Sequence, residues 1–113
     1  MFTYKRLTGP VYIPTTAGTI YAKPASTTSY IRNILIYNGS AGSQSIQLYL
    51  VPTGGTAGVA TCFWSVPVPP SETVTIEYSA NPGMVLDKTG DALKAATTTA
   101  SYVTISVFGA EES

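Results

Sequence analysis

The stretch Tyr30-Ile31-Arg32-Asn33-Ile34-Leu35-Ile36-Tyr37-Asn38, followed at once by Gly39-Ser40-Ala41-Gly42, is the strongest structural signal in this chain. Its β-branched and aromatic residues, stopped by small turn-forming residues, are typical of a buried β-strand. Simple alternation places Tyr30, Arg32, Ile34 and Ile36 on one face, and Ile31, Asn33, Leu35 and Tyr37 on the other. Because neither face is wholly polar, we predict a central strand with a core on one side and a partly apolar cover on the other.

Similar short runs recur about every ten residues on both sides of this strand, separated by turns that contain Gly or Pro. The clearest alternations predict that Val74, Ile76 and Tyr78, and later Val103, Ile105 and Val107, face a core. Residues 92–96 are predicted as a strand, although Asp91 could cap a helix there, because Thr97-Thr98-Thr99 follows. We therefore predict an all-β, single-domain antiparallel β-sandwich, jelly-roll-like, with about eight strands.

Turn chemistry predicts how some of these strands connect. The short Gly39–Gly42 segment predicts a hairpin, with the strands at 30–38 and 44–51 as antiparallel neighbours. Asn81-Pro82-Gly83 has the residues of a tight turn. Thr8-Gly9-Pro10 is expected to break regular structure, which divides the chain into an N-terminal arm or edge strand, 1–9, and a β-sandwich domain, 10–113.

The composition limits the function classes. Charged residues make up 11% of the 113, against an average of about 25%, and six basic residues balance six acidic ones. Without a basic patch we expect no nucleic-acid partner. A surface this poor in charge is weakly protected against association, which favours a protein that packs against neighbours.

Catalytic and metal-binding chemistry is poorly represented. The chain has no histidine, and its single cysteine, Cys62, lies in an apolar run and is interpreted as a small core residue. Glu72, Glu77, Asp87 and Asp91 are close in sequence but are interpreted as solvated strand and turn positions rather than as a catalytic or calcium site. We expect no enzyme activity, no cofactor, no metal and no small-molecule substrate.

Eight tyrosines are the remaining polar and aromatic feature. Tyr21, Tyr30, Tyr37, Tyr49 and Tyr102 are predicted to lie on or near strand faces opposite the core. They are either half-buried sheet residues or part of a protein–protein or carbohydrate-binding surface. No signal peptide or membrane span is visible, so we expect synthesis and assembly in a cytoplasm, with no membrane partner.

Several short motifs together resemble small virion structural proteins of tailed bacteriophages. They occur in this order along nearly the whole chain: Tyr4-Lys5-Arg6-Leu7, Ile20-Tyr21-Ala22-Lys23-Pro24-Ala25, Ile31 to Asn38, Leu50-Val51-Pro52-Thr53-Gly54-Gly55, Pro70-Ser71-Glu72-Thr73-Val74-Thr75 and Phe108-Gly109-Ala110-Glu111. The resemblance implies a late protein of the particle itself that acts by contact and not by reaction.

The resemblance implies a capsid cement or decoration protein on the outer surface of the major capsid protein shell. The alternative is a tail, baseplate or fibre component, with or without a host-glycan-binding surface. A homotrimer would suit three-fold positions of an icosahedral shell, with a dimer as the alternative. The expected partner-binding residues are the segment Phe2, Tyr4, Lys5, Arg6 and Leu7, together with Tyr21, Tyr37 and Tyr49. Lys5 and Arg6 would pair with acidic shell residues while the segment orders on binding.

Overall fold

The computed structural model describes residues 2–78 and 84–113. These residues form nine β-strands: β1 (Phe2–Tyr12), β2 (Gly18–Ala22), β3 (Thr28–Asn38), β4 (Gln44–Val51), β5 (Cys62–Val68), β6 (Thr73–Glu77), β7 (Met84–Leu86), β8 (Ala92–Thr97) and β9 (Val103–Glu112). The turn predicted at Asn81-Pro82-Gly83 lies outside the described residues. Within those residues there is no helix that could cross a membrane.

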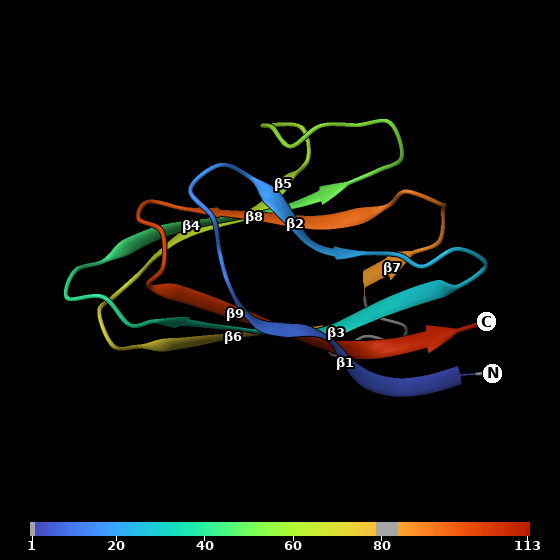
Figure 1. Ribbon diagram of the computed structural model, residues 1–113, viewed down its shortest axis with the longest axis horizontal. Helices are drawn as coiled ribbons and strands as arrows, with labels where there is room; N and C mark the ends of the chain where they lie inside the picture. The colour runs from blue at the N-terminus through green and yellow to red at the C-terminus, as the bar shows by residue number, and fades with distance from the viewer. Residues whose placement is uncertain (1, 79–83) are drawn as a thin grey trace.

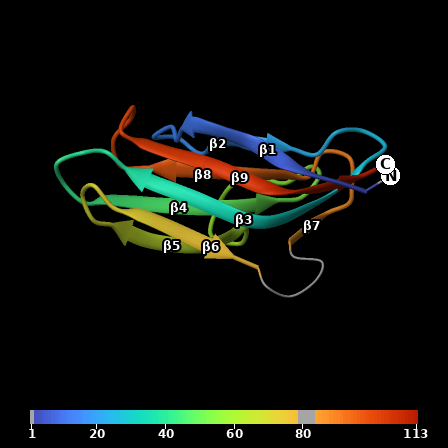
Figure 2. The ribbon, with the colours of Figure 1, turned by 90° about the horizontal axis from the view of Figure 1, so that it is seen from below.

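The strands form two antiparallel sheets packed face to face (Figure 1). One sheet has the order β1-β9-β3-β6, with β7 also paired to β3, and the other has the order β2-β8-β4-β5 (Figure 2). Most strands that follow one another in the chain belong to opposite sheets, as in a jelly roll. The short strand β7 is added to the eight strands of that pattern. The predicted all-β sandwich is thereby confirmed, and β8 is a strand as expected.

A single apolar core fills the space between the sheets. Val103, Ile105 and Val107 of β9 are fully buried, as the alternation predicted, and β6 follows with Val74 and Ile76 packed against the core. The largest fully buried side chains come from both sheets: Ile13, Ile31, Ile34, Ile36, Ile46, Leu48, Leu86, Leu93 and Ile105. Burying such side chains contributes about 1.5–3 kcal/mol each before the entropic cost of ordering the chain.

The strand β3 is central, as predicted; its two faces were predicted correctly from Asn33 onward but wrongly for Tyr30, Ile31 and Arg32. Ile31 pairs with Gly109 and Asn33 pairs with Phe108, so Arg32 is an extra residue on β3 relative to β9. This β-bulge reverses the alternation, because Ile31 faces the core together with Ile34 and Ile36. Arg32 and Asn33 therefore both lie toward the outer side of the sheet, where they line one depression.

A second bulge alters β2. Thr19 pairs with Lys94 and Tyr21 pairs with Leu93, which leaves Ile20 as the extra residue. Ile20 and Tyr21 are consequently both buried. The prediction that Tyr21 lies opposite the core was therefore wrong, because the bulge inserts one residue into the alternation.

The hairpin predicted at Gly39–Gly42 is also wrong, since β3 and β4 belong to different sheets. The cause is the side chain of Asn38, which is fully buried at the corner. Its amide nitrogen donates to the carbonyls of Gly42 and Val68 at 2.9 Å, and its Oδ1 accepts from the backbone nitrogen and the hydroxyl of Ser40. These bonds turn the chain from one sheet to the other.

The predicted break at Gly9 and Pro10 lies inside a strand, and a second strand also contains a proline. Gly9 and Pro10, which form a cis peptide bond, are within β1, which shifts register there and continues to Tyr12. Pro67 is within β5, where it pairs with Ser45. Both strands are at sheet edges, where proline is tolerated because one side of the strand needs no ladder hydrogen bonds.

Candidate functional site

The outer face of the β1-β9-β3-β6 sheet is rich in aromatic side chains. Residues paired across neighbouring strands point to the same side of a sheet, so the partners of Thr104, Ser106, Phe108 and Ala110, which alternate with Val103, Ile105 and Val107 of the core, point outward. Four large outward side chains are strongly exposed: Tyr4 by 70%, Tyr12 by 61%, Tyr37 by 45% and Leu35 by 37%. Phe108 and Tyr30 are half-buried between them.

The outer face of the other sheet is different. There Gln47 pairs with Ala96 and Ser65, and Tyr49 pairs with Lys94. The Tyr49 hydroxyl donates to the Gln47 side chain at 2.7 Å. Small and polar side chains therefore dominate the centre of this sheet, so the exposed aromatic surface of the sandwich is concentrated on one side.

One end of the aromatic face carries what we term the tyrosine patch: Tyr12, Leu35, Tyr37 and Tyr102. Tyr12 and Tyr37 both pair with Thr104 from opposite sides, so their backbones lie about 10 Å apart, twice the strand spacing. Tyr102 is half exposed, and its carbonyl accepts a hydrogen bond from Gly39, over which the Tyr37 ring packs. Tyr12, Leu35 and Tyr37 lie on β1 and β3, which both pair with β9, and Tyr102 immediately precedes β9.

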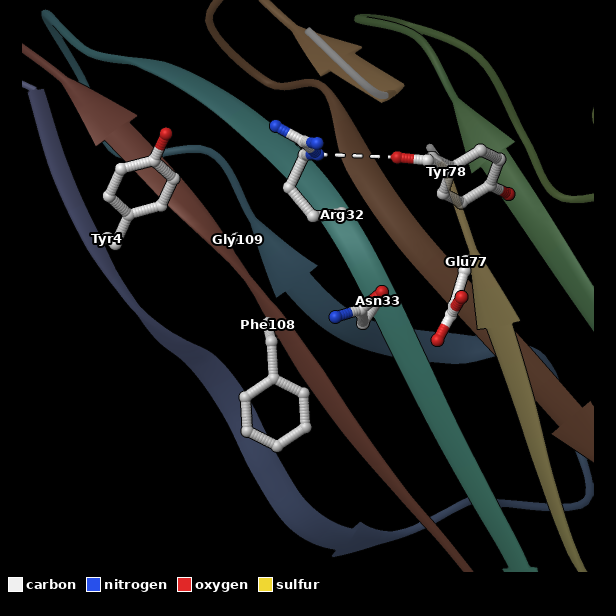
Figure 3. A pocket seen from close by; sticks show the side chains of 7 residues that line it. All are labelled: Tyr4, Arg32, Asn33, Glu77, Tyr78, Phe108 and Gly109. Carbon is white, nitrogen blue, oxygen red and sulfur yellow. Dashed lines mark hydrogen bonds between the residues drawn. The ribbon is translucent and has the colours of Figure 1, made fainter. Parts of the chain in front are cut away.

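The other end of the face carries a depression of about 530 Å³, lined by Tyr4, Arg32, Asn33, Glu77, Tyr78, Phe108 and Gly109 (Figure 3). Tyr4 from β1 and Phe108 from β9 stand on one side, and Asn33 and Glu77 lie on the other. Its volume falls within the range of roughly 300–1,000 Å³ typical of small-molecule sites. Four other depressions on the described part of the chain have volumes of about 170, 280, 190 and 300 Å³.

The bulge in β3 shapes this depression. It places the consecutive residues Arg32 and Asn33 at the same site, and the carbonyl oxygen of Tyr30 approaches Gly109 so closely that a Cβ there would lie 1.9 Å from it. Only glycine fits at position 109, because the β3 backbone occupies the place of a Cβ, and Gly109 itself forms part of the lining. Bulges commonly re-aim side chains beside functional sites.

Hydrogen-bond donors and hydrogen-bond acceptors both face the depression. Arg32 is anchored by its Nε, which donates to the Tyr78 carbonyl at 3.3 Å (Figure 3). Within residues 2–78 and 84–113, the side chains of Asn33 and Glu77 have no hydrogen-bond partner. The Tyr78 ring packs against the core, and burial raises the pKa of its phenol. The site thus offers donors, acceptors and aromatic surface together.

The residues predicted to bind a partner are distributed over several environments. Tyr4, Arg6 and Tyr37 lie on the aromatic face, whereas Tyr49 lies on the opposite sheet. The backbone of Phe2 pairs with Glu112, and its side chain is outside what the structure describes. Leu7 packs against the core, and Lys5 pairs with Glu111 at 3.0 Å.

Tyr21 belongs to a structural network between the sheets. Its hydroxyl donates to Glu111 Oε2 at 2.6 Å and lies 2.6 Å from the Ser29 hydroxyl. Burial, followed by the Glu111 carboxylate, raises the pKa of Tyr21 to about 12. The hydrogen bond from Tyr21 lowers the pKa of Glu111, with Lys5 acting in the same direction and burial opposing it. Lys5 and Tyr21 thus stabilise the fold.

Asp91 is also structural. Its Oδ1 accepts from the backbone nitrogen of Thr53 at 3.2 Å, and its Oδ2 accepts from that of Lys88 at 3.0 Å. Burial opposes ionisation of this carboxyl, but these hydrogen bonds outweigh it and lower its pKa. Among the described residues, no three His, Cys, Asp or Glu side chains are grouped as metal ligands.

The sequence did not predict several residues of the aromatic face and the depression. Leu35 and Tyr37 were correctly placed together on a partly apolar face, but Tyr12 and Phe108 were not assigned to that face. Phe108 could have been found, because it alternates with Val107 at the end of a clear strand. Arg32 and Asn33 acquire a common position only through the bulge, which the local sequence does not signal.

Comparison with known proteins supports the fold alone. No family model matches the chain, and no curated protein matches it. A solved structure described as "Bacillus endospore appendages form a novel family of disulfide-linked pili" aligns with a TM-score of 0.58 over 99% of this chain and 88% of that chain. Their sequence identity is 12%, so this similarity shows a common β-sandwich architecture.

Proposed function

We propose that this chain is a structural protein of a bacteriophage particle, a capsid cement or decoration protein that binds the outside of the major capsid protein shell and stabilises it. The observation that carries the proposal is the aromatic face, with the tyrosine patch at one end and a mainly polar face on the opposite sheet. The short sequence motifs that resemble virion proteins support the same conclusion. Jelly rolls occur in viral capsid proteins and in lectins, so the fold is compatible but not decisive.

The tyrosine patch has the chemistry of an interaction surface. Tyrosine is enriched at the energetic centres of interfaces because its ring buries a large area with few rotatable bonds, while its hydroxyl stays hydrogen-bonded. Thr104, a smaller side chain, lies between Tyr12 and Tyr37 on the central strand of the patch. Weak individual contacts would be multiplied by oligomerisation, as a homotrimer or dimer, and by the repeating lattice of a shell.

The segment Phe2–Leu7, expected from the sequence to bind the shell, is no longer the main contact in this proposal. It was expected to act as an arm that orders on the shell, but here it is an edge strand paired with β9, and Lys5 already has an acidic partner within the chain. Arg6 remains on the aromatic face and can meet an acidic shell residue. We therefore assign the main contact to the tyrosine patch and a secondary contact to Arg6.

A tail, baseplate or fibre component is the second candidate. The architectural similarity to a pilus-forming protein supports a subunit that assembles with copies of itself into a filament or tube. Electron microscopy of the concentrated protein separates the two candidates, because a fibre subunit would form filaments and a cement protein would form small closed oligomers.

Capsid shells from a phage that lacks this gene provide the direct test. Purified protein is expected to co-sediment with the shells and raise their Tm, because a ligand that binds only the assembled state stabilises it. The Tyr12→Ser/Tyr37→Ser variant should bind at least about tenfold more weakly. Tyr49→Ser, on the opposite sheet, is the matched control. Equal binding by all three proteins, or none by the wild type, contradicts the proposal.

A further inference from the structure

The depression around Arg32 and the tyrosine patch occupy different ends of the same sheet. Tyr4, at the depression, pairs with Ala110, whereas Tyr12 pairs with Thr104, six residues earlier on β9. At about 3.4 Å per residue, this places Tyr4 and Tyr12 roughly 20 Å apart, although Asn33 of the depression and Leu35 of the patch are neighbours on the outer face of β3. A partner centred on Tyr12 and Tyr37 therefore does not need to cover the Tyr4 end of the depression.

We propose that this depression is a binding site for a neutral sugar residue of the hexose or N-acetylhexosamine class. The aromatic side chains of Phe108 and Tyr4 border it on one side. An aromatic ring presents a negative face to the slightly positive C–H groups of a pyranose, so a sugar ring can pack against it while its hydroxyls stay directed to polar groups.

The polar groups match hydroxyls better than they match an ion. Arg32 supplies N–H donors, Asn33 supplies both a donor and an acceptor, and Glu77 supplies a carboxylate acceptor. Each sugar hydroxyl both donates and accepts, so it can use this mixed set. An anionic ligand that approached Arg32 would meet the Glu77 carboxylate in the same depression, and a cationic ligand would meet the guanidinium.

The site is also preorganised. Arg32 is held by its hydrogen bond to the Tyr78 carbonyl, and all the lining residues lie on or next to paired strands. Because the bulge and Gly109 fix the floor, a ligand would have little backbone to order on binding. Asn33 and Glu77 would exchange water for ligand hydroxyls without breaking a bond inside the described chain.

The test uses the isolated full chain and does not involve capsids, so its result is independent of the proposed virion role. Amide resonances are followed by NMR during titration with methyl glycosides of glucose, galactose, mannose and N-acetylglucosamine, with acetate and glucuronate as anionic probes. At least one neutral glycoside is expected to shift the amides of Asn33, Glu77, Phe108 and Gly109 with a Kd on the order of 1 mM, as suits so small a ligand.

Two variants make the assignment specific. Asn33→Ala should weaken binding at least about tenfold because it removes a hydrogen-bonding group, and Glu77→Gln should weaken binding because it replaces a charged acceptor by a weaker neutral amide oxygen. Glu72→Gln, an exposed carboxylate just before the same strand, is the matched control and should bind like the wild type. The proposal is overturned if no neutral glycoside binds, if binding maps elsewhere or is insensitive to both variants, or if only acetate or glucuronate shifts these amides.

Discussion

The hydroxyl of Tyr21 donates a hydrogen bond of 2.6 Å to Glu111 Oε2, which joins β2 of one sheet to β9 of the other. The other carboxylate oxygen of Glu111 accepts from Lys5 Nζ at 3.0 Å, so β1 is joined to the same point. The aromatic face is built on β1, β9 and β3, and its geometry therefore depends on this connection.

Replacing Tyr21 by Phe should lower the free energy of unfolding by about 1–2 kcal/mol. The substitution removes one hydroxyl and leaves the buried Ser29 side chain and a Glu111 oxygen without this partner. Urea denaturation followed by tryptophan fluorescence measures the change. Tyr37→Phe, on the exposed face, should change it by less than about 0.5 kcal/mol. A Tyr21→Phe variant as stable as the wild type would show that the network contributes nothing.

The stability of the chain should fall at both ends of the pH range. Glu111 has a pKa lowered from 4.5, so its contribution is present above about pH 4.5 and is lost as the pH falls through the folded value. Tyr21 has a pKa raised from 10.0 to about 12, so its contribution is present below pH 10 and is lost as the pH rises toward 12.

The pH dependence can be assigned by repeating the denaturation between pH 3 and pH 12 on Tyr21→Phe. The alkaline decline should become shallower, because the titrating phenol is gone, although Tyr30 and Tyr78 also have raised pKa values. The acidic decline should persist in part, because the pKa of Asp91 is lowered as well. Identical alkaline profiles for the variant and the wild type would contradict the assignment.

Replacing Gly109 by Ala should destabilise the chain by about 3 kcal/mol, the upper end of the usual cost of overpacking. The new Cβ would lie 1.9 Å from the Tyr30 carbonyl oxygen, so β3 and β9 would have to separate at the bulge. Gly42→Ala is the matched control, because nothing lies within 4 Å of its Cβ position, and it should be neutral or slightly stabilising. Similar unfolding free energies for both variants would show that the bulge can relax.

Replacing Asn38 by Ala should cost about 3 kcal/mol or more. Its side chain satisfies backbone groups of Ser40, Gly42 and Val68 in a fully buried corner, and truncation leaves several of them unpaired. Thermal unfolding of Asn38→Ala measures this loss of stability, with Asn33→Ala, on the outer face of β3, as the control. A loss smaller than about 1 kcal/mol would mean that the Gly39–Gly42 segment can turn between sheets without the asparagine.

The sequence predicts the fold class better than it predicts the connections. Strands with strict alternation, such as 103–107, were placed correctly because burial of one face imposes a period of two. The bulges at Ile20 and Arg32 were missed because an extra residue depends on the partner strand, not on local composition. The crossing at Asn38 was missed because loop length alone does not distinguish a hairpin from a sheet-to-sheet turn.

The candidate site shows the same limit. Leu35 and Tyr37 could be assigned to a partly apolar face from alternation, but Tyr12 reaches them only because β1 continues through Gly9 and Pro10. The depression needs residues from β1, β3, β6 and β9, which are far apart in the chain and meet only through the sheet order.

The most direct test of the proposed virion role is a cryo-electron microscopy reconstruction of a phage particle whose genome encodes this chain. We predict density for this β-sandwich at repeated positions on the outer surface of the capsid, with the tyrosine patch of Tyr12, Leu35, Tyr37 and Tyr102 against the major capsid protein. Absence of the chain from the particle, or attachment with this patch facing solvent, would contradict the proposal.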